Sequence, residues 1–197
     1  MSGTTATELV AANPENVTPT AARRILTLGM LAALVYTVVT GAILIASWYA
    51  ADHHFVYPLD DAYIGMAIAK NLALHGVWGV SRYGFTSADS SLLFPLLMAA
   101  VYQIAGVNEV APLAISWLAA VASIFVAERM LPGSLSRAGR ATALILFVIL
   151  TPLFVAGGLG MEHSVHLLFT LIFLQAFQKA RSGTRHWALR LWVWPPR

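Results

Sequence analysis

The feature that most constrains this chain is an uncharged run of 27 residues, Ile25–Ala51, directly after the pair Arg23-Arg24. A helix needs about 20 apolar residues to span a bilayer, whereas the apolar core of a cleaved signal peptide has only about 7–15. The run therefore predicts an uncleaved membrane anchor. Residues 1–22 are rich in Ala, Thr, Pro and Asn and have no periodicity. We expect them to form a disordered cytoplasmic tail.

The composition extends this expectation to the rest of the chain. Hydrophobic residues make up 58% of the sequence and charged residues only 11%, whereas a soluble domain carries about 25% charged residues. So few charges cannot cover a water-facing surface, which predicts a membrane domain over residues 23–181. The net charge of +3 does not indicate nucleic-acid binding, because the cations flank apolar runs and form no patch. The absence of Cys excludes disulfides and thiolate metal sites.

Three further uncharged runs are predicted to cross the membrane. They are Val110–Ala127, Ala141–Met161 and Ser164–Gln178. Pro152 is expected to kink the second of these runs, or to end its helix near Thr151. The third run has only 15 residues, but Lys179 and Arg181 can extend it by reaching to the interface.

The stretch Leu92–Ala105 is uncharged but short, and Pro95 and Gln103 interrupt it. Runs of this length are often re-entrant or interfacial. If it does not cross, ten of the twelve Lys and Arg residues face the cytoplasm, as the positive-inside rule favours. We therefore predict an all-α, polytopic membrane bundle of about four spanning helices with the N-terminus inside. The acidic residues placed on the outer face are then Asp52, Asp60, Asp61, Asp89, Glu109 and Glu162.

The first outer loop, residues 52–109, is expected to contain a short amphipathic helix on the outer leaflet. Asp60 or Asp61 is a good N-cap, since an aspartate accepts hydrogen bonds from the first free amides of a helix. Gly76 is expected to stop the helix. One apolar stripe recurs every four residues, at Ile64, Ile68 and Leu72.

Several polar residues in these loops have a simple structural interpretation. Asp60 and Asp61 could serve only as a helix cap. His53 and His54 are most simply interfacial residues, because a metal site needs further ligands. Glu162, between the last two predicted spans, is either an exposed loop carboxylate or a functional group, since ionisable residues near a membrane often mark function.

Taken together, the motifs of the outer segments resemble the GT-C membrane glycosyltransferases, closest to the arabinofuranosyltransferase-like and protein-mannosyltransferase-like members. The resemblance covers about residues 25–180 and rests on the order of several short motifs. These motifs are Asp60-Asp61-Ala62-Tyr63-Ile64, Asn71-Leu72, Gly76, Gly84-Phe85-Thr86-Ser87 and Gly160-Met161-Glu162. The chain departs from the family pattern at Ala88-Asp89, which follow Ser87, and at His163.

The resemblance implies transfer of a sugar from a polyprenyl-phosphate donor to an acceptor at the outer face of the cell membrane, in the synthesis of the cell envelope. Asp60 or Asp61 would act as general base on the acceptor. Analogy with the family's first-loop acid favours Asp60, although the sequence itself does not separate these two carboxylates. The residues expected to bind substrate are Tyr63, Lys70, Arg82, Thr86, Ser87, Glu162 and His163. Lys70 and Arg82 are the outer-loop cations that could neutralise the donor phosphate, and the resemblance leaves the use of a divalent cation open.

The length of the chain keeps other functions open. Members of this family generally have eight or more spans, and the basic, Trp-rich residues 182–197 do not continue the pattern. We expect these residues to be a truncated or frame-shifted end. The first alternative is a non-catalytic membrane protein, either a remnant or a partner-binding subunit. A transporter segment is the second alternative. Transport predicts acidic or polar groups inside the spans. Here the spans are almost free of them, and the exceptions, His166 and Gln175, are too few.

Overall fold

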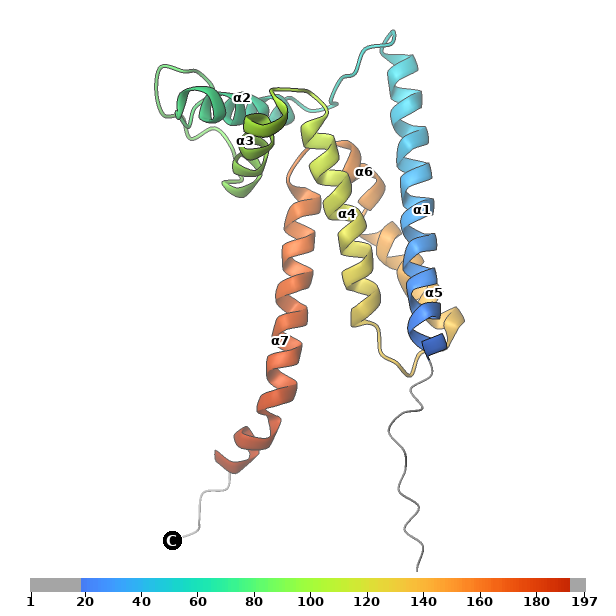
Figure 1. The fold of residues 1–197 in the computed structure, drawn as a ribbon. Coiled ribbons are helices and arrows are strands. Elements are labelled where there is room, and N and C mark those ends of the chain that lie inside the picture. Colours follow the sequence, from blue (N-terminus) through green and yellow to red (C-terminus); the bar gives the residue numbers. More distant parts are fainter. Residues whose placement is uncertain (1–18, 192–197) are drawn as a thin grey trace, which may run out of the picture.

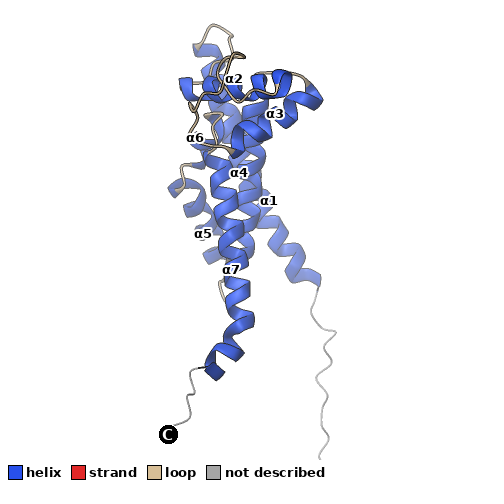
Figure 2. Ribbon diagram, turned by 90° about the vertical axis from the view of Figure 1, so that its left-hand side faces the viewer, coloured by secondary structure: helices blue, strands red, loops and turns tan. Residues whose placement is uncertain are grey.

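The structure is a computed structural model that describes residues 19–191, and the side chains of residues 28–181. Every regular element in this range is an α-helix (Figure 2), as the sequence predicts. The helices are α1 (Pro19–Ala50), α2 (Asp60–His75), α3 (Leu93–Ala105), α4 (Ala111–Met130), α5 (Arg137–Leu150), α6 (Leu153–Gly158) and α7 (His163–Leu191). The predicted tails 1–22 and 182–197 lie outside the described residues, except where α1 and α7 extend into them.

Among the described residues, two helices are long and apolar enough to cross a membrane. They are the Leu28–Ala50 part of α1, with 23 residues, and α4, with 20 residues. Only 22% of the most apolar stretch in α1 is buried inside the molecule. A core helix of a soluble protein would be mostly buried, because large apolar surfaces are rarely left in water. The large exposed area of α1 therefore favours contact with lipid.

The long helices lie side by side and alternate in direction (Figure 1). α1 runs toward the end of the molecule that holds α2 and α3, and α4 returns toward the opposite end. The pair α5–α6 and then α7 repeat this alternation, with α4 packed against both α1 and α7. The start of α1, the α4–α5 connection and the end of α7 therefore lie at one end, which we call the basic end. The opposite end carries the α1–α2 loop, α2, α3 and the α6–α7 loop.

Pro152 interrupts the predicted span Ala141–Met161, as the sequence indicates. α5 ends at Leu150 and α6 begins at Leu153, so that the run forms helices of 14 and 6 residues. Proline lacks the amide hydrogen that an α-helix needs at this point and its ring clashes with the preceding turn. Neither helix alone reaches the roughly 20 residues that a span requires.

The predicted helix in the first outer loop is confirmed, but the predicted cap is wrong. Leu59 occupies the N-cap position and makes no side-chain hydrogen bond, while Asp60 and Asp61 lie inside the first turn. Carboxylates in that turn still interact favourably with the positive end of the helix dipole. Gly76 ends the helix with a left-handed backbone, φ 66°, a conformation that glycine adopts without the cost of a Cβ.

α2 packs on α3, which has only 13 residues. At 1.5 Å per residue α3 is about 20 Å long, too short for a hydrocarbon core of about 30 Å. Of the predicted stripe on α2, Ile68 is fully buried and Leu72 packs against the shared core. The apolar face of α2 therefore covers α3, although the sequence interpretation assigned that face to the lipid.

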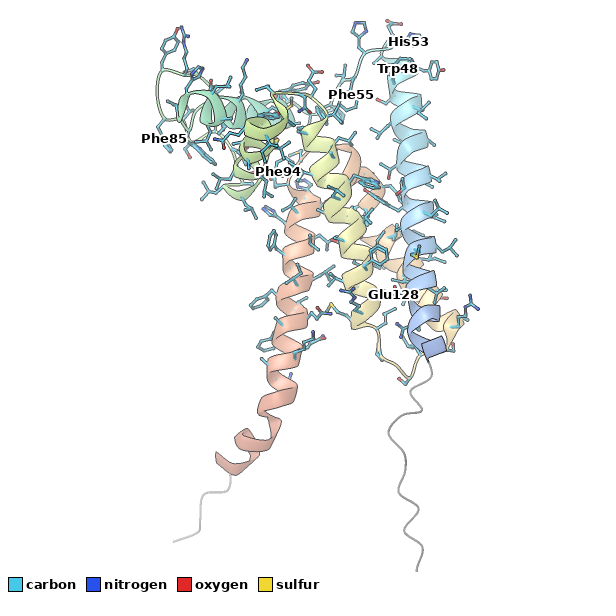
Figure 3. All side chains as sticks on the ribbon, in the orientation of Figure 1. Trp48, His53, Phe55, Phe85, Phe94 and Glu128 are labelled. Carbon is cyan, nitrogen blue, oxygen red and sulfur yellow. The ribbon has the colours of Figure 1, made fainter. Side chains whose placement is uncertain are left out.

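Glu128 corrects the predicted boundary of the second span. The sequence suggests that the span ends before this charge, but Glu128 lies within α4 and is only 3% exposed. Its carboxylate accepts a hydrogen bond from the backbone amide of Gly29 in α1, at 3.1 Å. A Cβ at residue 29 would overlap this carboxylate, so glycine allows the two helices to meet here. Figure 3 shows Glu128 toward the basic end, far from Phe85 and Phe94.

Candidate functional site

Three carboxylates from distant parts of the chain line one pocket of about 130 Å³. Asp61 comes from the first turn of α2, Asp89 from the loop before α3, and Glu162 from the residue before α7. The remaining lining residues are mostly small or apolar: Ala62, Ile64, Gly65, Ala88, Ser90, Phe94, Gly160 and Met161. The sequence predicted that Asp61 and Glu162 share a face, and the structure brings them to the same pocket.

Glu162 is held in place by its neighbours, with only 8% of its surface exposed. The hydroxyl of Ser90 donates a hydrogen bond to Oε1 of Glu162 at 2.9 Å. The hydroxyl of Ser116 in α4 donates to the carbonyl oxygen of Met161 at 2.9 Å, which fixes the chain just before Glu162. The interpretation of Glu162 as an exposed loop carboxylate is therefore wrong, because its side chain is buried and accepts a hydrogen bond from Ser90.

Tyr57 packs against the α6–α7 loop, which carries Glu162. Its ring lies where a Cβ of Gly160 would be, and its hydroxyl donates to the carbonyl of Glu109 at 2.6 Å. The same hydroxyl accepts from the amide of Leu113 at 3.2 Å, and burial raises the pKa of Tyr57 above its ordinary value. The Tyr57 amide donates to the hydroxyl of Tyr63 at 2.9 Å. Tyr63, which was expected to bind substrate, thus binds the backbone of the segment that leads into α2.

Asp89 is the site residue that the sequence analysis missed. Its Oδ1 accepts a hydrogen bond from the amide of Ser91 at 2.7 Å. Its Oδ2 faces Gly65 of α2, where a Cβ would come too close. Burial raises the pKa of Asp89, the Ser91 amide opposes that rise, and the charges of Glu162 and Asp61 add to it. An aspartate whose side chain accepts a hydrogen bond from the backbone amide two residues later is a common turn signal, and the segment Asp89-Ser90-Ser91 carries it.

The raised pKa of Asp89 predicts a pH-dependent stability. For an acid whose folded-state pKa exceeds its unfolded value, the free energy of unfolding falls as pH rises through that interval. Asp89→Asn cannot ionise and keeps an oxygen for the Ser91 amide. We expect this variant to have a higher thermal unfolding midpoint than the native chain at pH 7. The difference should vanish below pH 3.8, the ordinary pKa of aspartate.

The control for this measurement is Asp60→Asn, which removes an exposed carboxylate from the favourable end of α2. This variant should not raise the midpoint at pH 7. Thermal unfolding in detergent at pH 3.5, 5 and 7 gives the comparison. An Asp89→Asn midpoint equal to the native one at all three pH values would show that ionisation of Asp89 does not destabilise the fold.

The other predicted site residues are exposed and do not line the pocket. They are Asp60, Lys70, Arg82, Thr86, Ser87 and His163. The Arg82 guanidinium lies over the Tyr83 ring, 5.1 Å from its centroid. The Thr86 amide donates to the carbonyl of Trp78 at 3.0 Å. Lys70, Arg82 and the Thr86-Ser87 segment belong to the α2–α3 unit, so they lie at the same end of the molecule as the pocket (Figure 1).

The pocket is acidic, and no Lys or Arg is among its lining residues. In the part of the chain whose side chains are described, no group of three or more His, Asp or Glu residues could hold a metal ion. Carboxylate oxygens accept hydrogen bonds, so Asp61, Asp89 and Glu162 offer acceptors at this pocket. No protein-family model, curated protein or solved structure matches the chain.

Proposed function

We propose that this chain is a membrane glycosyltransferase that moves a sugar from a polyprenyl-phosphate donor to an acceptor hydroxyl at the outer face. One observation carries the proposal: Asp61, Asp89 and Glu162 meet at a single pocket although they lie far apart in the sequence. Together with the resemblance of the outer motifs to GT-C enzymes, this convergence supports an acid–base site. An alcohol is a poor nucleophile while protonated, and a nearby carboxylate can accept its proton.

Asp61 is the proposed general base. It is exposed at the pocket, whereas Ser90 engages Glu162 and the Ser91 amide engages Asp89. The acceptor oxygen bonds to the anomeric carbon while its proton passes to Asp61. The bond between that carbon and the phosphate oxygen breaks, and its electron pair leaves with the polyprenyl phosphate. A single displacement of this kind inverts the anomeric centre.

Asp89 and Glu162 are proposed to orient the acceptor by accepting hydrogen bonds from its hydroxyls. Three carboxylates repel a phosphate, so the donor phosphate is expected to lie outside the pocket. Lys70 and Arg82 belong to the same end of the molecule and are the cations proposed to meet it. Neutralising the charge that develops on a leaving phosphate is a large part of such catalysis.

The proposed membrane topology has four crossings, with the N-terminus in the cytoplasm. The first is α1, the second α4, the third the α5–α6 pair and the fourth α7. Two observations support this order: the alternating directions of the helices, and the basic residues near the ends opposite the pocket. Positively charged loops are retained in the cytoplasm. The pocket would then face outward, as a lipid-linked sugar donor requires.

The topology predicts which introduced cysteines react from outside. The native chain has no Cys, so each substitution reports alone. Ser87→Cys and His163→Cys, both exposed at the pocket end, should label with a membrane-impermeant maleimide on intact cells. Ser134→Cys, in the α4–α5 connection, should label only after the membrane is permeabilised. Labelling of Ser134→Cys on intact cells would reject the proposed topology.

The activity itself is tested with the full chain in lipid nanodiscs. Isotope-labelled polyprenyl-phosphate arabinose and polyprenyl-phosphate mannose serve as donors, and a panel of short glycans and hydroxylated peptides serves as acceptors. The proposal expects a labelled, inverted product from one donor, with release of polyprenyl phosphate. No product and no release with either donor, from a chain with the expected topology, would contradict it.

A second candidate function is a non-catalytic membrane subunit. It is favoured by the size of the pocket, about 130 Å³, because small-molecule sites usually measure about 300–1,000 Å³. The acidic lining without Lys or Arg also favours it. For this candidate the same nanodisc assay should give no turnover, while Asp61→Asn should leave expression and topology unchanged.

A further inference from the structure

A long apolar groove follows the basic-end half of α1, where α4 and the start of α5 lie against it. Its volume is about 660 Å³. Leu28, Leu31 and Leu34 of α1 form one wall, and Leu31 and Leu34 are each more than half exposed. α4 contributes the opposite wall, and α5 contributes Arg137. This apolar surface is therefore continuous with the helix surface that the proposed topology places in lipid.

The length of the groove along α1 matches the hydrocarbon thickness of one leaflet. On α1 it runs from Leu28 to Thr37, nine residue steps or about 13–14 Å at 1.5 Å per residue. Half of a hydrocarbon core of about 30 Å is about 15 Å. At the far end the Trp117 indole donates to the Thr37 hydroxyl at 3.2 Å, which in turn donates to the carbonyl of Ala33 at 2.8 Å. Both polar groups are satisfied within the protein, so a purely apolar occupant fits beside them.

The near end of the groove is positively charged. Arg137 is the first residue of α5, and no acidic residue lies in that first turn. A cation at a helix N-terminus is unfavourable unless an anion meets it, because that end carries positive partial charge. Arg140 donates to the carbonyls of Glu128 and Pro132. The Glu128 carboxylate is turned to the Gly29 amide of α1.

We propose that this groove binds one acyl chain of an anionic phospholipid from the leaflet at the basic end, with the phosphate at Arg137. The proposal rests on the proposed membrane insertion and is independent of the proposed catalysis. Charge complementarity selects this occupant. A zwitterionic lipid would fill the apolar walls equally well but would bring no net negative charge to Arg137.

Trp117 provides the readout, because it lines the groove. The full chain is placed in nanodiscs of phosphatidylcholine with increasing amounts of either brominated phosphatidylglycerol or brominated phosphatidylcholine. Bromine quenches tryptophan fluorescence on contact. The chain has six Trp residues, so the contribution of Trp117 is taken as the difference between the native chain and Trp117→Phe.

The expected result is half-maximal quenching of Trp117 at an about fivefold lower mole fraction of the anionic lipid, the effect expected of one basic residue at a lipid surface. Arg137→Gln should abolish this preference and Arg137→Lys should retain it. Arg129→Gln is the matched control, because Arg129 is exposed near the same end but does not line the groove. It should retain the preference.

Three results would overturn the proposal. Equal quenching by the two lipids would exclude a selective site. A loss of preference in Arg129→Gln as large as that in Arg137→Gln would show a general surface-charge effect. No quenching of Trp117 by either lipid, in a chain that enters nanodiscs, would mean that protein covers the groove. A chain that fails to enter nanodiscs would instead refute the membrane insertion on which both proposals depend.

Discussion

Asp61→Asn is expected to lower the rate of glycosyl transfer by about 100- to 10,000-fold, the usual contribution of a positioned general base. The substitution keeps the size of the side chain and removes its ability to take a proton from the acceptor. Because the lost interaction belongs to the transition state, the effect should fall on kcat more than on KM. The nanodisc assay with the labelled donor that supports turnover by the native chain measures both constants.

The matched control is the neighbouring carboxylate. Asp60→Asn makes the same chemical change in the same turn of α2, but Asp60 does not line the pocket. Its activity should stay within about threefold of native, since only a surface interaction with the helix end is lost. Equal losses in the two variants would point to a general electrostatic effect of this turn. A loss confined to Asp60→Asn would move the base to that residue.

The comparison of these two residues illustrates what the sequence could predict. An apolar stripe that recurs every four residues identified α2, and Gly76 identified its end. Which of two adjacent carboxylates faces the pocket depends on the rotation of α2 about its axis. Packing on α3 sets that rotation, where Gly65 faces Met98 of α3, and a stripe of one apolar residue in four leaves it open.

Asp89 and Glu128 were missed for related reasons. Asp89 stands in a polar, glycine-containing segment and has the appearance of a loop residue, and only the tertiary contact with Gly65 brings it to the pocket. Glu128 marks the end of an uncharged run, which usually coincides with the end of a span. Its partner is the backbone amide of Gly29, 99 residues earlier. Contacts to backbone groups of distant helices leave no side-chain signature.

Gly160→Ala is expected to destabilise the fold by roughly 2–5 kcal/mol, since a left-handed residue other than glycine costs about 1–2 kcal/mol and overpacking about 1–3 kcal/mol. Gly160 has φ +66°, and a Cβ on it would overlap the buried Tyr57 ring. Tyr57 is tied to Glu109 and Leu113 by hydrogen bonds, so it cannot move aside freely. The α6–α7 loop must shift instead, and Glu162 is two residues away. The thermal unfolding midpoint in detergent should fall by roughly 4–20 °C, at about 2–4 °C per kcal/mol for a chain of this size.

Gly158→Ala separates this effect from a general cost of adding a methyl group. Gly158 is the last residue of α6, and a Cβ there meets nothing within 4 Å. Alanine has the higher helix propensity, so the midpoint should stay level or rise slightly. If Gly160→Ala keeps the native midpoint, Tyr57 does not confine this loop. If Gly160→Ala costs less stability in a Tyr57→Ala background than in the native chain, the Tyr57 ring is the obstacle, because that background already lacks the ring.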